Sequence, residues 1–184
     1  MPIKSTIICF FFGLILFIPD GIMGQEISKT SSGIAVGGSG LVGVTQQYRP
    51  IRQVALELGI YGRSAYVNVF EPKWYFGPAA DAGLSVFVQH RDKPLKKMVV
   101  YNGFYLKAGF GLKDLQEYNA SIGWVREIYS EKHPGRFVQL QIGPSIRHRV
   151  ETHLNTRYPP GHQEQTQEWY SAMIYTRLTW FFVL

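Results

Sequence analysis

The sequence holds few side chains whose type and spacing would support catalysis. Ser145 and His148 form the nearest serine–histidine pair, and such a pair can hydrolyse esters because the imidazole takes the proton of the attacking hydroxyl. Side chains an odd number of residues apart on a strand lie on opposite faces. If this segment is a strand, the two groups cannot meet. The sequence therefore predicts no catalytic residues, and we expect no enzyme.

Metal and cofactor sites are not indicated either. The five histidines lack the spacing to carboxylates and to one another that metal sites use, and we interpret them as solvated loop side chains: His90, His133, His148, His153 and His162. The stretch Gly33–Gly43 is rich in glycine, but it lacks the Lys-Ser/Thr ending and the following helix of a phosphate-binding loop. We expect no cofactor and no metal.

The composition indicates a surface that is not wholly in contact with water. Charged residues make up 17% of the chain and aromatic residues 15%, whereas ordinary globular domains carry about 25% charged residues. The net charge of +6 would suit nucleic acid, but the chain has no motif of interleaved aromatic and basic residues for RNA. Nucleic acid is therefore not an expected partner.

Residues 1–24 are predicted to be a secretory signal peptide. Lys4 precedes an apolar run, Ile7–Ile18, and a small residue, Gly24, stands where cleavage is expected. The run is too short for a membrane-spanning helix, which needs about 20 residues. Cleavage would remove Cys9, which is the only cysteine, so the mature domain, residues 25–184, would form no disulfide.

The mature sequence alternates apolar and polar residues with period two, which is typical of β-strands. We expect eight strands in one domain, with no helix longer than a turn. They are a glycine-rich strand Gly33–Val44, Val54–Tyr61, a weaker strand near Ala65–Phe70, Ala82–Gln89, Phe104–Phe110, Tyr118–Trp124, Val138–Ile146 and Ala172–Phe182. Pro144 interrupts one strand, and beside Gly143 it suggests a β-bulge.

The polar face of these strands consists mainly of glycine and serine, which suits a narrow interior better than a water-facing surface. An outer-membrane barrel has this arrangement, with apolar residues facing lipid, whereas a lipocalin-like barrel has the reverse. The few charges on the polar face are of both signs. Because an unpaired buried charge is costly, we expect a charge network in the lumen, formed by Glu57, Lys107, Arg147 and Arg177.

Aromatic residues gather near the predicted strand ends, as in the girdles that lie at the two membrane interfaces. They are Tyr48, Tyr61, Trp74, Tyr75, Tyr101, Trp169, Tyr170 and Trp180. The chain ends on a strand that alternates Ile174, Leu178, Trp180, Phe182 and Leu184.

This terminal strand resembles the closing strand of bacterial outer-membrane proteins. The resemblance implies that Trp180, Phe182 and Leu184 are an assembly signal read by the barrel-assembly machinery. The mature chain is similar in architecture to the small OmpA/OmpX-like barrels. The fold class expected is therefore all-β, an eight-stranded antiparallel transmembrane β-barrel in the bacterial outer membrane, and we expect a monomer.

Eight strands enclose an interior that side chains fill, so we expect a structural or surface-binding protein and not an open pore. Four basic residues near the predicted outer rim would face lipopolysaccharide phosphates or other outer-membrane lipid: Arg49, Lys73, Arg149 and Arg157. Two alternatives remain open at this point. One is a soluble, secreted lipocalin-like barrel that binds a small apolar ligand, and the other is a lipid-modifying barrel enzyme.

Overall fold

The computed structural model describes residues 29–38, 41–67, 73–93, 97–111, 115–133, 135–154 and 164–183. These residues form eight strands: β1 (Thr30–Gly37), β2 (Val42–Ile51), β3 (Val54–Val67), β4 (Lys73–Lys93), β5 (Met98–Gly111), β6 (Leu115–Ser130), β7 (Arg136–Leu154) and β8 (Glu164–Val183). Within the described ranges, no helix has the length and apolarity to cross a membrane.

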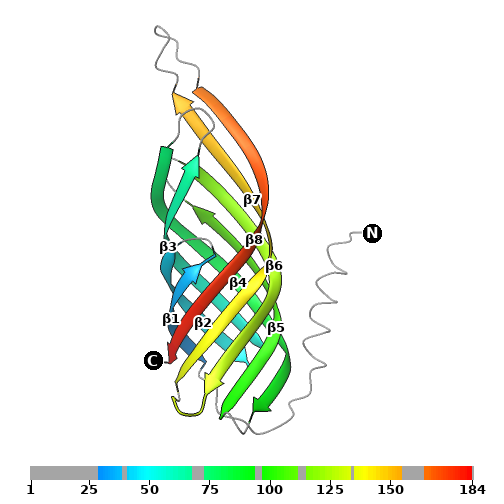
Figure 1. The fold of residues 1–184 in the computed structure, drawn as a ribbon. Coiled ribbons are helices and arrows are strands. Elements are labelled where there is room, and N and C mark those ends of the chain that lie inside the picture. Colours follow the sequence, from blue (N-terminus) through cyan, green and yellow to red (C-terminus); the bar gives the residue numbers. More distant parts are fainter. Residues whose placement is uncertain are drawn as a thin grey trace, which may run out of the picture.

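Each strand pairs antiparallel with the next one along the chain, and β1 also pairs with β8, so the sheet closes on itself as a barrel. β1 begins and β8 ends at the same end of the closed sheet (Figure 1). The connections β2–β3, β4–β5 and β6–β7 also lie at this end, which we call the terminus end. The opposite end, with the remaining connections, is the loop end. An all-β antiparallel sheet of eight strands confirms the predicted class and strand number.

Two of the predicted strands were wrong although the total was right. The segment Gly33–Val44 is not one strand, because the chain turns back between β1 and β2. Gly37 and Gly38 have φ angles of 89° and 72°, which only glycine adopts without strain. The predicted strand near Ala65–Phe70 is also not a separate element: residues 65–67 are the end of the long strand β3, and residues 68–70 lie outside the described part.

The β1–β2 hairpin is much shorter than the strands beside it. Pairing of β1 with β8 reaches only Gly37–Arg177, and pairing of β2 with β3 reaches only Val42–Gly62. Towards the loop end, β3 and β8 continue past the hairpin (Figure 1). In the described residues no strand pairing joins β3 to β8 there, so each has an open edge.

The apolar side of nearly every strand faces outward. Leu58, Ile60, Ile146 and Ile174 are each more than 60% exposed, and many other large apolar side chains are exposed with them. Within the closed part of the sheet, the odd-numbered residues point inward, and several of these are charged or polar and buried. A water-soluble protein places these two classes of side chain the other way round. The predicted assignment of the two faces is thus confirmed.

Pro144 does not produce the predicted bulge. The β6–β7 pairs on its two sides, Ser121–Ser145 and Trp124–Ile142, keep one register. The strands instead approach closely here, because a Cβ on Gly143 would lie 2.1 Å from the carbonyl oxygen of Ile122. Register shifts occur at two other places, between Tyr48 and Ile51 in the β2–β3 pair and between Phe87 and Gln89 in the β4–β5 pair.

Candidate functional site

The interior is crossed by three groups of ion-paired side chains, stacked from the terminus end to the loop end. The central group contains Glu57 on β3, whose Oε2 lies 2.7 Å from Lys107 Nζ on β5. Gln139 Nε2 donates to Glu57 Oε1 at 2.7 Å, and Lys107 Nζ also donates to Gln141 Oε1 at 3.1 Å. Every one of these side chains is almost fully buried. Strands β3, β5 and β7, which are not neighbours in the sheet, are therefore linked across the interior.

Arg177 extends the central group toward the loop end. Its Nη1 lies 3.6 Å from Glu57 Oε2 and 3.4 Å from Asp81 Oδ2. Tyr61 donates its hydroxyl to Asp81 Oδ1 at 3.2 Å, and the Arg177 guanidinium lies over the Tyr61 ring at 5.1 Å. Two carboxylates thus face two cations, so the formal charges of the central group cancel, as a buried network requires.

Interior glycines provide the room for the long side chains of this group. Gly83 is the cross-strand partner of Lys107, and a Cβ there would lie 2.6 Å from the Lys107 side chain. Gly43 is the partner of Tyr61 in the same way, and a Cβ there would lie 2.3 Å from the Tyr61 ring. Glycines of the polar face therefore serve as the small partners of large polar residues.

A second group lies at the terminus end. Arg49 on β2 forms an ion pair with Glu127 on β6. Gln47 and Tyr129 also donate to the Glu127 carboxylate, at 2.8 and 2.9 Å. Arg49 is 3% exposed. The prediction that Arg49 is a basic residue of the outer rim is therefore wrong. The parity of its strand position directs the side chain inward, where it is ion-paired with Glu127.

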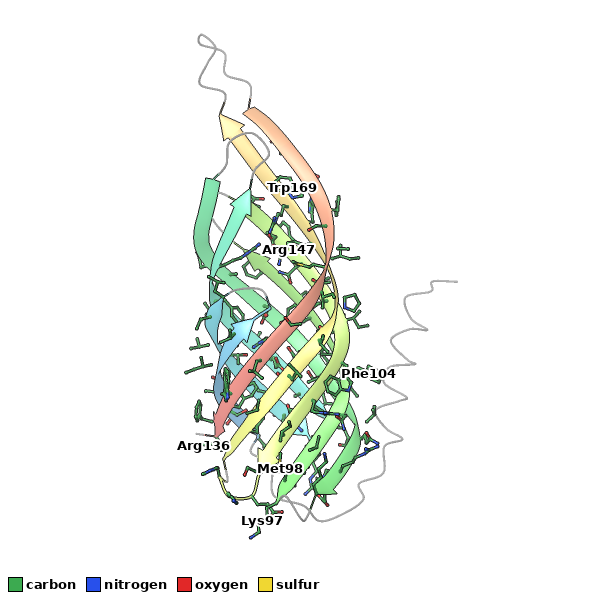
Figure 2. The ribbon with its side chains drawn as sticks, in the orientation of Figure 1. Lys97, Met98, Phe104, Arg136, Arg147 and Trp169 are labelled. Carbon is green, nitrogen blue, oxygen red and sulfur yellow. The ribbon has the colours of Figure 1, made fainter. Side chains whose placement is uncertain are left out.

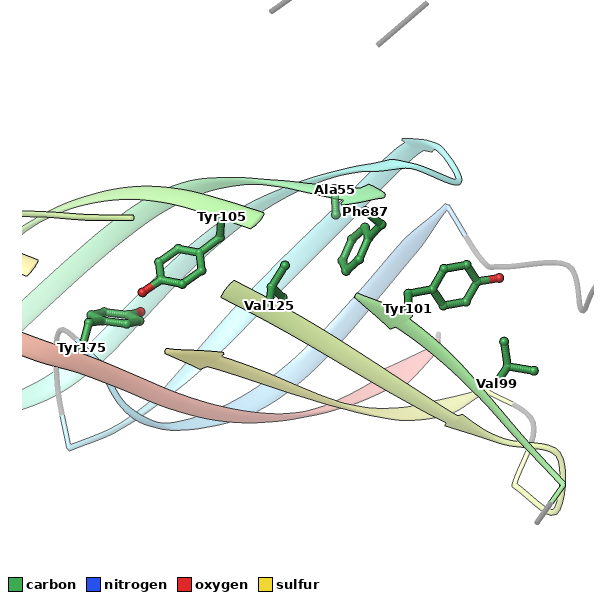
Figure 3. Close-up of a cluster of buried hydrophobic side chains, with 7 residues drawn as sticks. All are labelled: Ala55, Phe87, Val99, Tyr101, Tyr105, Val125 and Tyr175. Atoms are coloured by element: carbon green, nitrogen blue, oxygen red, sulfur yellow. The ribbon is translucent and has the colours of Figure 1, made fainter. Parts of the chain in front are cut away.

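Aromatic side chains fill the interior around this second group. Tyr129 stacks on Phe137, and Phe137 on Phe181, with ring centroids 4.5 and 4.6 Å apart. The Arg49 guanidinium lies 4.5 Å above the Phe87 ring. Figure 3 shows buried apolar and aromatic side chains following one another along the interior, from Val99 and Tyr101 to the facing rings of Tyr105 and Tyr175, whose centroids are 5.6 Å apart.

The third group lies toward the loop end and is centred on Glu117 of β6. Its carboxylate pairs with Arg63 on β3 and, on β7, with Arg147 at 2.7 Å and Arg149 at 2.5 Å. Figure 2 places Arg147 well above Arg136, which marks the terminus end. Of the four residues predicted to form one lumen network, Glu57, Lys107 and Arg177 come together, whereas Arg147 belongs to this separate group.

The remaining predicted positions are distributed as follows. Arg149 points into the interior. Lys73 is the first residue of β4, while Arg157, Leu184 and the predicted signal peptide, residues 1–24, lie outside the described residues. Trp180 and Phe182 lie on the outward face near the terminus end, each 41% exposed, and their role in assembly stays a prediction.

The aromatic girdle is partly different from the one predicted. Tyr61 and Tyr101 face the interior. On the outward face, Tyr118, His148 and Tyr170 form a continuous row across β6, β7 and β8. The imidazole stacks on Tyr170 at a centroid distance of 4.5 Å and on Tyr118 at 6.3 Å. His148 is thus a member of an outward aromatic row and not a loop residue.

Ser145 and His148 lie on opposite faces, as their spacing predicts. Ser145 is buried in the interior and donates to the carbonyl oxygen of Ala120 at 3.2 Å. His148 faces outward, with its Nε2 3.3 Å from Glu168 Oε2. No direct serine–histidine contact exists between them.

Sequence reasoning missed Asp81, Glu117, Glu127 and Arg63 as members of the interior groups. All four have odd numbers and lie on strands whose odd positions face inward. This shared parity is the signal that would have found them. The predicted strands ended before these four residues or began after them, so their parity could not be assigned from the sequence.

Searches against protein-family models, curated proteins and solved structures find no match to this chain.

Proposed function

We propose that this protein is a small outer-membrane β-barrel with a sealed interior and a structural or surface-binding role. The observation that carries this proposal is the distribution of side chains in a closed sheet. Large apolar residues cover the outside, while the buried charged side chains form ion pairs inside. This distribution of side chains is stable when lipid surrounds the outside of the barrel.

The strand lengths and the outward aromatic residues support the same proposal. All strands except the eight-residue β1 are long enough for the 9–11 residues or so that a tilted membrane strand needs. The row Tyr118–His148–Tyr170 lies toward the loop end, and Trp180 and Phe182 lie toward the terminus end. Aromatic residues at both borders of an apolar zone are typical of membrane interfaces.

The side chains of the interior support a sealed barrel rather than a diffusion pore. The central group links three strands across the lumen, and the stacked rings of Tyr129, Phe137 and Phe181 occupy the terminus end. Passage of a solute would require several ion pairs to break at once, and breaking a buried pair is expensive. The protein would therefore act through its surface and not by conduction.

The orientation follows from the proposed membrane location. Both ends of the barrel domain and the three connections of the terminus end would face the periplasm, and the loop end would face the outside. Outer-membrane lipid, including lipopolysaccharide, is the proposed partner, and the barrel-assembly machinery would recognise the terminal strand. We propose a monomer, because closure of the sheet leaves no unpaired strand edge in its closed part.

A soluble lipocalin-like barrel would need an apolar interior to hold its ligand. The interior described above is instead crossed by charged and amide groups, so the observations favour the membrane protein. The geometry gives the third alternative, a lipid-modifying enzyme, no arranged nucleophile and base at Ser145 and His148.

The experiment that tests the proposal is gel migration of the protein from fractionated cells, with and without boiling in SDS. We expect the protein in the outer-membrane fraction and a shift in apparent mass on boiling, because a closed barrel resists SDS until it is heated. A soluble periplasmic protein without a shift contradicts the proposal. Conductance of the purified protein in a planar bilayer is the companion measurement, and a steady open channel contradicts the sealed interior.

A further inference from the structure

The Glu117 group differs from the other two interior groups in its charge. Three guanidinium groups, from Arg63, Arg147 and Arg149, surround one carboxylate. Three positive charges and one negative charge leave a net charge of +2 among the described members. The side chains of these arginines are only 10%, 14% and 16% exposed, so water screens their mutual repulsion poorly.

The other two groups show that such an excess is not a general property of this interior. In the central group Lys107 and Arg177 face Glu57 and Asp81, and at the terminus end Arg49 faces Glu127. Both groups are neutral by this count. The positive excess is therefore confined to the loop end, where the interior is closest to the outside in the proposed orientation.

A buried amide beside the arginines has no partner of its own. Asn119 lies two residues from Glu117 on the same inward face and opposite Arg147 in the β6–β7 pair. It is 7% exposed, and neither its Nδ2 nor its Oδ1 has a hydrogen-bond partner among the described residues. A buried amide without partners is destabilising. A ligand with an oxygen acceptor would satisfy Asn119 Nδ2.

The interior face at this level is accessible past the short hairpin. Met173 has the inward parity of β8 and is the cross-strand partner of the buried Ser145. It is nevertheless 40% exposed. No described strand covers this part of β8 on the side of its open edge, because β1 ends at the level of Arg177. A group could therefore reach the interior from the side as well as from the loop end.

We propose that the Arg63–Arg147–Arg149 group, together with Asn119, is a binding site for a phosphate group. A phosphate monoester carries close to two negative charges at neutral pH, which matches the net charge of +2. Guanidinium groups bind phosphate oxygens in a bidentate manner, and Asn119 supplies an amide donor. Without the ligand, Glu117 holds the three arginines together, and it competes with the phosphate when the ligand binds.

This inference rests on the proposed function in one respect, because the proposed membrane orientation determines which side of the membrane the site faces. The phosphate group has two possible sources with the same chemistry. One is a lipid headgroup that enters between β3 and β8, and the other is a free phosphorylated solute that enters at the loop end. The experiment below separates the two.

The test is calorimetry on the full mature protein, purified from the membrane fraction and kept folded in neutral detergent micelles. Inorganic phosphate is titrated in one arm, and dodecyl phosphate is added to the micelles in the other, both against sodium chloride at matched ionic strength. Saturable binding of inorganic phosphate supports the site and a free solute. Binding of dodecyl phosphate alone supports the site and a lipid headgroup. No saturable binding in either arm overturns the inference.

Variants show whether binding occurs at the proposed residues. Arg147→Gln and Asn119→Ala should each weaken binding, Arg147→Gln by at least about tenfold, since a hydrogen bond to a charged group contributes about 1.5–3 kcal/mol. Glu117→Gln should strengthen binding, because it removes the competing carboxylate. A purely structural cluster would not give this gain. Arg136→Gln is the charge-matched control: it removes one exposed cation at the terminus end and should leave the affinity unchanged.

Gel migration of each variant, unboiled and boiled, separates loss of the site from loss of the fold. Equal affinity of the wild type, Arg147→Gln and Glu117→Gln overturns the inference even if phosphate binds. A protein that is folded and in the outer membrane but binds no phosphate leaves the proposed function standing. If the protein is instead soluble and binds phosphate through Arg147, the binding site is supported and the proposed membrane location is contradicted.

Discussion

Glu57 on β3 and Lys107 on β5 form an ion pair of 2.7 Å across the interior, and both side chains are only 1% exposed. The two residues are 50 positions apart in the sequence, and β4 separates their strands in the sheet. The pair therefore links parts of the sheet that backbone hydrogen bonds do not link.

Replacing one partner of this pair should destabilise the barrel strongly. Glu57→Gln leaves Lys107 without its carboxylate and Arg177 with only Asp81. Removing one member of a buried ion pair typically costs about 3–5 kcal/mol. We expect a lower urea midpoint for unfolding from detergent micelles, measured by tryptophan fluorescence.

Two further variants control this measurement. Glu131→Gln removes a carboxylate from an exposed turn at the terminus end and should leave the midpoint unchanged. The double variant Glu57→Gln/Lys107→Met should recover part of the loss, because no lysine is then left unpaired. Equal midpoints for Glu57→Gln and the wild type would show that the interior pair contributes nothing to stability.

The close approach of β6 and β7 predicts a strict requirement for glycine at one position. In Gly143→Ala the new Cβ would lie 2.1 Å from the Ile122 carbonyl oxygen and 2.6 Å from the Gly123 Cα. Backbone atoms must move apart, and overpacking of this kind costs about 1–3 kcal/mol. The matched control is Gly62→Ala, whose Cβ would meet only the Val42 carbonyl oxygen at 3.9 Å. The same thermal midpoint for the two variants contradicts the prediction.

A charge on the outward face tests the proposed contact with lipid. Leu106 is 56% exposed near the middle of β5, so Leu106→Arg places a cation in the apolar zone and should cost about 2–4 kcal/mol in a bilayer. Ile51→Arg makes the same change at the terminus end of β2, where the cost should be much smaller. Stability is measured by unfolding from lipid vesicles. An unchanged stability of Leu106→Arg argues for an outer surface that meets water.

The predicted assembly signal is tested by the double variant Trp180→Ala/Phe182→Ala. Both side chains face outward, so we expect a lower amount of folded protein in the outer membrane but normal refolding from urea into micelles. Ile174→Ala, also outward on β8 and 73% exposed, is the control and should reach normal levels. A parallel loss in cells and in refolding would mean that the two residues stabilise the barrel and do not serve as a signal.

The fold was predictable from the sequence because one physical rule applies to every strand. Side chains alternate between faces with period two, and the segments around Glu57 and Lys107 keep one consistent polar parity. The outward position of Leu58, Ile60 and Leu106 follows from this parity alone. Their exposure was predictable without knowing which strands pair.

The partners across the interior were not predictable in the same way. Arg49 and Glu127 are 78 residues apart, and they meet only because the closed sheet brings β2 and β6 to the same level. Arg147 has the parity expected for the lumen, but its level along the barrel gives it Glu117 in place of Glu57. Level depends on the register of every intervening strand, which period-two alternation does not specify.

The short β1–β2 hairpin also determines where the closed sheet is weakest. The ring is closed by β1, an eight-residue strand, whereas β7 provides a 19-residue strand to the seam on the other side of β8. Backbone opening begins where the fewest hydrogen bonds must break together. The seam between the first and last strands should therefore open before the β7–β8 seam, and amide exchange should be faster in β1 than in β7.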